Sequence, residues 1–350
     1  REASDIHFEP EASFLRIRYR TDGLLRQIRV LHKSYWPAMA VRIKVLAGLN
    51  IAETRAPQDG RISLTVSGQA VDFRISAQPT IHGENIVMRV LDRKKGIVPL
   101  EGLGLPAAQI DLLRLMIARP EGVILFTGPT GSGKTTTLYS ILNHINAEGI
   151  NIMTLEDPVE YPMVLIRQTS VSEASKLDFA NGIRAMMRHY PDVILVGEIR
   201  DKETAEMAFR AAMTGHQVYS TLHTNTANGA IPRLSDIGIL PDILAGNIIG
   251  VVAQRLVRKL CPHCARQRTA RAFELKLLGV PEDQPAPMLY EAVGCPQCEH
   301  QGYKGRMAVM ELMRMDTDID ELIARRATFR EIRNAARAKG FTSLAEDGLR

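Results

Sequence analysis

The feature that most constrains the fold of this chain is a glycine-rich stretch, Gly128-Pro129-Thr130-Gly131-Ser132-Gly133-Lys134-Thr135. It fits the pattern G-x-x-x-x-G-K-[ST] without departure, and Thr136 continues it into a predicted helix. The apolar residues 123–126 before it predict a buried strand. Such a strand, loop and helix direct backbone N–H groups and a helix N-terminus at the phosphates of a nucleotide. We therefore expect a nucleoside-triphosphate site, in which Lys134 reaches the β- and γ-phosphates and the Thr135 hydroxyl ligates Mg²⁺.

Length and composition indicate a globular protein of more than one domain. A chain of 350 residues can bury two or more cores, and its 45% hydrophobic and 24% charged residues are ordinary for soluble proteins. A net charge of +5 is too small to indicate nucleic-acid binding by itself. The sequence shows no apolar run of membrane-spanning length and no signal peptide. Because it opens on Arg1 rather than Met, we expect an excised fragment of a longer chain.

Residues 1–95 predict a small α/β domain. Leu15, Ile17 and Tyr19 alternate with arginines, as in a half-buried strand with a basic outer face. Asp22-Gly23 predicts a hairpin turn. A helix is expected over residues 34–49, and further strands over residues 61–66, 71–75 and 86–91, with residues 57–60 as a break before them. Residues 96–105 read as a linker.

Residues 106–350 alternate helical patterns with short apolar strands, which is typical of a parallel sheet. After the strand at 123–126 we expect strands over residues 152–155, 193–196 and 218–221. A helical tail follows over residues 316–350. Within it, Thr328 and Glu331 predict a capping box, and Gly340 predicts the end of that helix.

Acidic and histidine residues follow these predicted strands. Glu156 comes directly after one strand and Glu198 just after another, at the strand ends where an open α/β sheet places its ligand chemistry. Phosphoryl transfer needs a carboxylate on the metal side and a group that activates water. Glu198 is the candidate for the metal side and Glu156 for the water, although the two could exchange roles. His216 and His223 lie at opposite ends of one strand, and His223, at the carboxyl end, is the γ-phosphate candidate.

The four cysteines form two C-x-x-C pairs, Cys261/Cys264 and Cys295/Cys298. Two such knuckles can complete a tetrahedral Zn²⁺ site, and a longer insert between them costs little chain entropy. Redox dithiols, disulfides and unrelated buried cysteines are the alternatives. The predicted site is structural, since four thiolates leave no open position. The insertion that carries it spans residues 255–305.

A run of basic residues lies between Ile243 and Phe273, where the sequence contains no acid. This run is either a solvated face or a docking surface for acidic protein, lipid headgroups or nucleic acid. Aromatic residues for base stacking are nearly absent from it, which argues against nucleic acid.

In their order along the chain, these motifs resemble those of the secretion ATPases of type II secretion and type IV pilus assembly. The resemblance covers almost the whole chain. Residues 3–10, 57–61 and 79–84 resemble the amino-terminal domain of that family, residues 156–160 its acidic box, residues 191–201 its second nucleotide motif and residues 214–225 its histidine box. The chain departs from the family pattern at His189-Tyr190 and, inside the histidine box, at Gln217 and Tyr219.

The resemblance implies an α/β fold class with two domains. It implies a RecA-like P-loop ATPase core over residues 106–350, a smaller PAS-like domain over residues 1–95 and a tetracysteine zinc-binding insertion. In the family, amino-terminal arginines reach the nucleotide, and by motif these are Arg61, Arg74 and Arg89. Each subunit would take its place in a homohexameric ring. The four cysteines indicate the assembly and secretion branch, because pilus-retraction relatives usually lack them.

The implied function is an ATP-hydrolysing motor for pseudopilin or pilin assembly, with Mg²⁺ and Zn²⁺ as metals. Its partner would be an inner-membrane platform protein, so that a cytoplasmic protein is held at the inner membrane through partners only, without nucleic acid. One alternative is a DNA-uptake or DNA-translocating ATPase, whose turnover DNA would stimulate with a steep salt dependence. A second is a P-loop small-molecule kinase, which would need an added acceptor.

Overall fold

The computed structural model describes residues 3–66, 68–91, 97–171, 176–281 and 283–349. The chain forms two compact units, Arg1–Ile97 and Val98–Arg350. The boundary expected at residue 95 lies outside the described residues. Within the segment expected as a linker, Leu100–Leu103 forms a short 3-10 helix, and the Leu100 side chain is buried.

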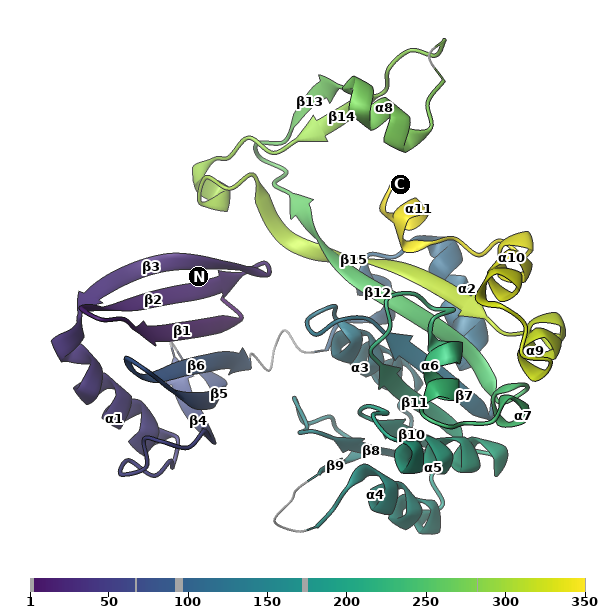
Figure 1. The fold of residues 1–350 in the computed structure, drawn as a ribbon, viewed down its shortest axis with the longest axis horizontal. Helices are drawn as coiled ribbons and strands as arrows, with labels where there is room; N and C mark the ends of the chain where they lie inside the picture. The colour runs from purple at the N-terminus through teal and green to yellow at the C-terminus, as the bar shows by residue number, and fades with distance from the viewer. Residues whose placement is uncertain (1–2, 67, 92–96, 172–175, 282, 350) are drawn as a thin grey trace. The chain divides into compact units, whose positions relative to one another are not determined.

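The first unit is one antiparallel sheet with a helix against it (Figure 1). In chain order its strands are β1 (Asp5–Pro10), β2 (Phe14–Thr21), β3 (Leu24–His32), β4 (Gln58–Val66), β5 (Gln69–Thr80) and β6 (Gly83–Leu91), and in space the order is β3-β2-β1-β6-β5-β4. Helix α1 (Trp36–Leu46) follows a 3-10 turn at Lys33–Tyr35. Leu15, Ile75 and Ile86 are fully buried beside Trp36, whose ring stacks on Phe8 with centroids 5.9 Å apart.

Two features of this sheet differ from the expectation. Strand β1 was not among the predicted strands, although Ile6 and Phe8 alternate with polar residues and pack on the core; it pairs with β2 and β6. The segment expected as a break belongs to β4, where Gly60 pairs with Ile75. A Cβ on Gly60 would lie 2.6 Å from the Ala47 carbonyl oxygen, so the glycine serves a close backbone approach and not a turn. The hairpin is confirmed: Asp22 and Gly23 both have positive φ.

The second unit is a twisted sheet covered by helices, and it confirms the predicted parallel sheet (Figure 1). Its strands, in spatial order, are β15 (Tyr303–Arg314), β12 (Ile248–Leu260), β7 (Gly122–Thr127), β11 (Gln217–Leu222), β10 (Val193–Val196), β8 (Ile152–Glu156) and β9 (Ile166–Ser170). Every neighbouring pair is parallel except β12 with β15.

The helices of this unit connect the strands and form the tail. They are α2 (Ala107–Ile117), α3 (Lys134–Ile145), α4 (Phe179–Met186), a 3-10 turn at Met187–His189, α5 (Lys202–Met213), α6 (Ala230–Asp236), α7 (Pro241–Leu244), α9 (Thr317–Ala324), α10 (Phe329–Ala338) and α11 (Leu344–Gly348). The capping box of Thr328 and Glu331 is present at the start of α10, and Gly340 follows that helix with positive φ, as expected. None of the helices in the described ranges combines the length and the apolar run that a membrane span requires.

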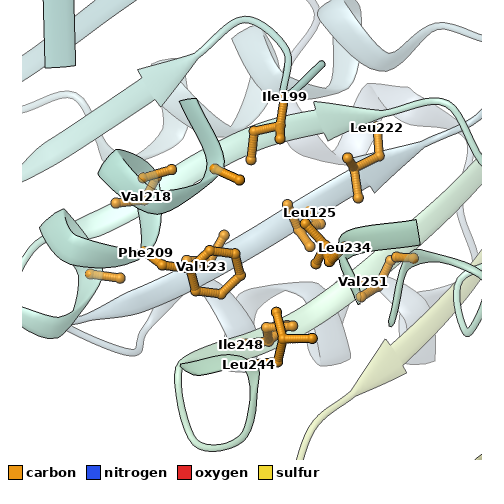
Figure 2. Packing of buried hydrophobic residues seen from close by; sticks show 14 of the residues in the cluster. Val123, Leu125, Ile199, Phe209, Val218, Leu222, Leu234, Leu244, Ile248 and Val251 are labelled. Carbon is orange, nitrogen blue, oxygen red and sulfur yellow. The ribbon is translucent and has the colours of Figure 1, made fainter. Parts of the chain in front are cut away.

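A hydrophobic core holds the sheet to α4, α5, α6, α7, α9 and α10. Figure 2 shows Val123 and Leu125 of β7 among side chains of the flanking strands and of α5, α6 and α7. Residues of β7 are buried throughout, which explains why its sequence is a continuous apolar run. Full burial of one such side chain stabilises the fold by about 1.5–3 kcal/mol. The rigid centre of this unit is therefore the strand that leads into the glycine-rich loop.

The two departures from the family pattern in β11 form a buried network. The Gln217 amide donates to the carbonyl oxygens of Ile117 (2.7 Å) and Arg119, at the end of α2. The Tyr219 hydroxyl donates to Gln217 Oε1 at 2.9 Å. Because the last carbonyls of a helix lack partners within the helix, Gln217 satisfies groups that burial would otherwise leave unpaired.

Strands β12 and β15 extend beyond the sheet as a two-stranded ribbon that carries the cysteines (Figure 1). The ribbon pairs as far as Leu260 and Tyr303, where the Arg258 guanidinium lies 3.8 Å from the centre of the Tyr303 ring. Beyond it lie β13 (Arg266–Thr269), α8 (Ala272–Leu278), β14 (Met288–Glu291) and a 3-10 turn at Pro296–Cys298. We call residues 261–302 the cysteine module.

Candidate active site and metal centre

The glycine-rich loop connects β7 to α3, in the context expected for a phosphate loop. Gly133 precedes the helix in the left-handed region, with φ of 91°. The Lys134 ammonium donates to the carbonyl oxygens of Gly128 (2.7 Å) and Pro129 (3.1 Å). The side chains that a nucleotide would meet are exposed, namely Pro129, Thr130, Thr135 and Thr136 together with Gly131. Ser132 Oγ is buried and has no hydrogen-bond partner among the described residues.

Strand β12 supports this loop from beneath, a role that the sequence analysis did not assign. Gln254 Oε1 accepts from Thr137 Oγ1 of α3 at 2.9 Å. The Arg255 guanidinium donates to the Gln254 carbonyl oxygen (2.9 Å) and to the Asn225 carbonyl and side-chain oxygens (3.2 Å each). Arg255 thereby links the loop's support to the histidine box. Only the order of strands in the sheet brings these residues to the loop.

Burial and two charged neighbours set the protonation of Lys134. Burial lowers the pKa of the Lys134 ammonium, the Arg255 charge lowers it further, and the Glu198 carboxylate opposes both. A bound anion would stabilise the charged form of an ammonium in such surroundings. The site is therefore suited to phosphate.

Glu198 and His223 lie together just after β10 and β11, which are neighbours in the sheet. His223 Nε2 is 3.4 Å from Glu198 Oε2. Arg200, which was not predicted as a site residue, forms an ion pair with Glu198 and lies 3.9 Å from Asp157. This pairing raises the pKa of the Arg200 guanidinium. His216 lies at the other end of β11 and contacts the Ala211 carbonyl oxygen, as expected of a structural histidine.

Glu156 lies at the end of β8, with its carboxylate buried and hydrogen bonded. Its oxygens accept from Tyr139 Oη, Thr154 Oγ1 and, at 3.3 Å, Gln168 Nε2. Burial raises the pKa of the Glu156 carboxyl, while the hydrogen bonds from Thr154 and Tyr139 act in the opposite direction. Tyr139 and Gln168 were not among the predicted site residues. A carboxylate whose pKa is raised by burial is a stronger proton acceptor than an exposed one.

The three arginines expected to reach nucleotide form a row in the first unit. Arg61 pairs with Arg74 across β4 and β5, and Arg74 pairs with Arg89 across β5 and β6. Directly opposite residues project from the same face of a sheet, and like charges there are destabilising without an anion. Asp72 accepts from Arg61 at 3.0 Å and Asp5 accepts from Arg89 at 3.2 Å. The row thus lies on one face of the sheet, with Arg61 and Arg89 held by acids of the same sheet.

The four cysteines come together at the base of the cysteine module. Their sulfur atoms all lie within 4.8 Å of one another, and three of the separations are 3.8–3.9 Å. Four sulfurs around zinc, at about 2.3 Å each, are about 3.8 Å apart. Backbone N–H groups of Gly294 and Gly302 donate to Cys264 and Cys298, as they would to thiolates. The cluster therefore fits one tetrahedral metal ion.

Part of the basic run is paired with acids in the folded chain. Glu291 on β14 pairs with Arg266 and Arg268, and Glu274 on α8 pairs with Arg268. Glu291 reaches the run through the β13–β14 pairing, whereas Glu274 follows Arg268 by six residues on α8. Two acids therefore pair with three of the six Lys and Arg side chains of the run, namely Arg266, Arg268 and Arg271.

Comparison with known proteins places the chain in one family. The family model "Type II/IV secretion system protein" matches residues 1–350. "Type II secretion system ATPase E" of Vibrio cholerae is 47% identical over 347 residues, covering 99% of this chain and 69% of that protein. "Type II secretion system protein HxcR" of Pseudomonas aeruginosa is 46% identical over 349 residues, covering 100% of this chain and 71% of that protein.

Solved structures agree with the fold. The pilus retraction motor PilT with bound ADP is 29% identical and superposes with a TM-score of 0.61, over 99% of this chain and 92% of PilT. The Legionella pneumophila ATPase DotB, at 23% identity, has a TM-score of 0.69 over 99% of this chain and 86% of DotB. The predicted α/β class, with a P-loop ATPase core and a four-cysteine cluster, is confirmed. A match over every residue to one family model, with relatives almost half identical, shows that this protein belongs to the Type II/IV secretion system protein family and is an ATPase.

Proposed function

We propose that this protein is the ATP-hydrolysing motor of a type II secretion or type IV pilus machine, which works as a homohexamer to assemble pseudopilin or pilin. The observation that carries the proposal is its identity of 46–47%, over 99–100% of its length, to two proteins named for type II secretion. The proposed domains are residues 1–95, a linker over 96–105, and the ATPase core over 106–350 with its cysteine insertion at 255–305 and helical tail at 316–350.

In the proposed nucleotide site, the loop residues bind ATP with Mg²⁺. The amides of residues 128–136 surround the phosphates, and Lys134 exchanges the carbonyl oxygens of Gly128 and Pro129 for phosphate oxygens. Thr135 is the hydroxyl ligand available to the metal. Magnesium, when bound, would neutralise charge on the β- and γ-phosphates.

The two glutamates receive different roles in this proposal. Glu198 lies near enough to Lys134 to influence its charge, and it contacts His223, so it is placed on the metal side with His223 towards the γ-phosphate. Glu156, whose pKa is raised by burial, activates the attacking water. The arginines of the amino-terminal row, Arg61, Arg74 and Arg89, are proposed to bind nucleotide phosphates.

Zinc is the proposed metal of the cysteine cluster, with Cys261, Cys264, Cys295 and Cys298 as its ligands. The sulfur separations support this choice. Four thiolates saturate the ion, so its proposed role is to fold the cysteine module. That module would dock on an inner-membrane platform protein, which places the motor in the cytoplasm at the membrane surface through partners only. Nucleic acid is not a proposed partner, since the basic run between Ile243 and Phe273 offers almost no aromatic side chain for base stacking.

ATP hydrolysis by Lys134→Ala tests the proposal. Loss of one charge that stabilises the transferring phosphoryl group costs about 2.7–4 kcal/mol, so turnover should fall about 100- to 1000-fold. Lys276→Ala removes the same side chain from the exposed face of α8 and serves as the matched control. Turnover of Lys134→Ala within tenfold of the control would refute the nucleotide site. Turnover that required an added acceptor, or failure of the chain to restore pseudopilin assembly in a strain lacking its own motor, would refute the motor.

A further inference from the structure

The side chain of Tyr139 connects the phosphate loop to Glu156. Tyr139 lies on α3 five residues after Lys134, which is about 7.5 Å along the helix. It is 1% exposed, and its hydroxyl donates to Glu156 Oε2 at the end of β8. The helix that begins at the phosphates therefore also contacts the candidate base.

The Tyr139 hydroxyl has partners on all sides. It accepts from the backbone N–H of Glu160 at 3.3 Å and from Gln168 Nε2 of β9 at 3.4 Å. A phenol offers one donor and two acceptor positions, so these contacts satisfy it completely. The Tyr139 ring packs edge-on against Tyr161, with centroids 6.2 Å apart. One atom thus joins α3, β8, β9 and the segment that follows β8.

The carboxylate of Glu156 is held from both sides. Thr154, two residues earlier on the same face of β8, donates to Oε1, and Tyr139 donates to Oε2. Only the Tyr139 contact comes from the helix that carries Lys134. We propose that Tyr139 is a positioning residue for hydrolysis: it fixes the Glu156 carboxylate relative to the phosphate loop, so that the helix which binds the phosphates also orients the group that activates water. The inference rests on the role proposed for Glu156.

A purely structural role is the simpler alternative, in which Tyr139 fills the core. A phenylalanine would fill nearly the same volume, but it would remove the hydrogen bond that Tyr139 donates to Glu156 Oε2. The alternatives also predict different pH profiles. The Tyr139 hydrogen bond holds the pKa of Glu156 down against burial, and Glu160 is the charged neighbour that acts with burial. Loss of the hydroxyl should therefore raise the pKa of Glu156 and move the acid limb of turnover to higher pH.

Tyr139→Phe in the 350-residue chain tests the inference, with Tyr219→Phe as the matched control. Tyr219 is also a buried tyrosine of this unit, but its hydroxyl contacts Gln217 and not Glu156. We expect Tyr139→Phe to lower kcat about 10- to 100-fold because the base is misplaced, with KM for ATP within about threefold of wild type. The acid limb of the pH profile of kcat should move to higher pH in Tyr139→Phe. Tyr219→Phe should keep the wild-type kcat and pH profile while losing thermal stability. The inference is overturned if the two variants have the same kcat and acid limb.

Glu156→Gln separates failure of this inference from failure of the proposed base. If Glu156→Gln loses turnover but Tyr139→Phe behaves like the control, the base stands and the positioning role is wrong. If Glu156→Gln retains turnover, both the role of Glu156 as the base and the positioning role of Tyr139 are wrong. In the double variant, Tyr139→Phe should add nothing to the loss caused by Glu156→Gln, because it acts only through that carboxylate. A further loss of about tenfold in the double variant would show an independent role and overturn the inference.

Discussion

Gly128→Ala should destabilise the second unit strongly because two separate costs apply at that position. Gly128 has φ of 147°, a backbone conformation that costs an L-residue about 1–3 kcal/mol. An added Cβ would also lie 2.6 Å from the Gln254 carbonyl oxygen and 2.8 Å from Ser132 Oγ. The first contact is with backbone of the supporting strand, which cannot rotate away, and such overpacking costs about 1–3 kcal/mol more. The expected total is about 4 kcal/mol.

Gly131→Ala in the same loop is the matched control. Gly131 also has positive φ, of 79°, but a Cβ there would meet no atom within 4 Å. Only the backbone cost of about 1–2 kcal/mol applies to it. Urea denaturation without nucleotide should therefore place Gly128→Ala about 2–3 kcal/mol below Gly131→Ala. The corresponding gap in Tm is about 5–10 °C for a unit of this size. Binding of an ATP analogue should be lost in Gly128→Ala even where the unit is still folded. Equal midpoints for the two variants would refute the reasoning, because the difference depends wholly on β12 lying against the loop.

The remaining predictions concern the metal, the arginine row and the buried carboxylate. Cys295→Ser should lose the one zinc per chain and unfold residues 261–298 while ATP affinity is kept; full zinc content, or lost ATP binding with a native circular dichroism spectrum, would contradict this. Arg89→Ala should raise KM for ATP about tenfold. The Tm without nucleotide should be unchanged, because Asp5, the acid that pairs with Arg89, keeps its ion pair with Arg20 at 3.4 Å; an unchanged KM would show that Arg89 does not bind the nucleotide. Glu156 has a pKa above its unfolded value of 4.5, so the wild type should lose stability relative to Glu156→Gln as pH rises above that value; parallel urea midpoints between about pH 5 and 8 would show that the carboxyl is not perturbed.

Local patterns were sufficient for several parts of this protein. The glycine-rich loop, the Asp22-Gly23 hairpin and the capping box at Thr328 lie where the sequence predicted them, because each depends on residues a few positions apart. The continuous apolar runs also predicted a parallel sheet, since strands buried on both faces need no polar alternation. The spacing of the four cysteines indicated one cluster, as observed.

Longer-range relations needed the tertiary structure. Neither Arg255 nor Tyr139 carries a local sequence signal for the nucleotide site, because arginines on strands and tyrosines on helices are common in proteins of every function. Their roles depend on β12 lying beside β7 and on α3 facing the end of β8. Sheet order follows from how distant segments bury one another, which periodicity does not encode.

The arginine row shows the same division. Sequence resemblance named Arg61, Arg74 and Arg89, but only the strand register sets them side by side on one face. A slip of one residue in β5 would send Arg74 to the opposite face, because side chains alternate with a period of two. The sequence by itself determined which chemical groups this ATPase carries and which local turns present them. The packing of strands from distant parts of the chain decided which of those groups meet, since register and strand order are fixed only when the whole core is buried at once.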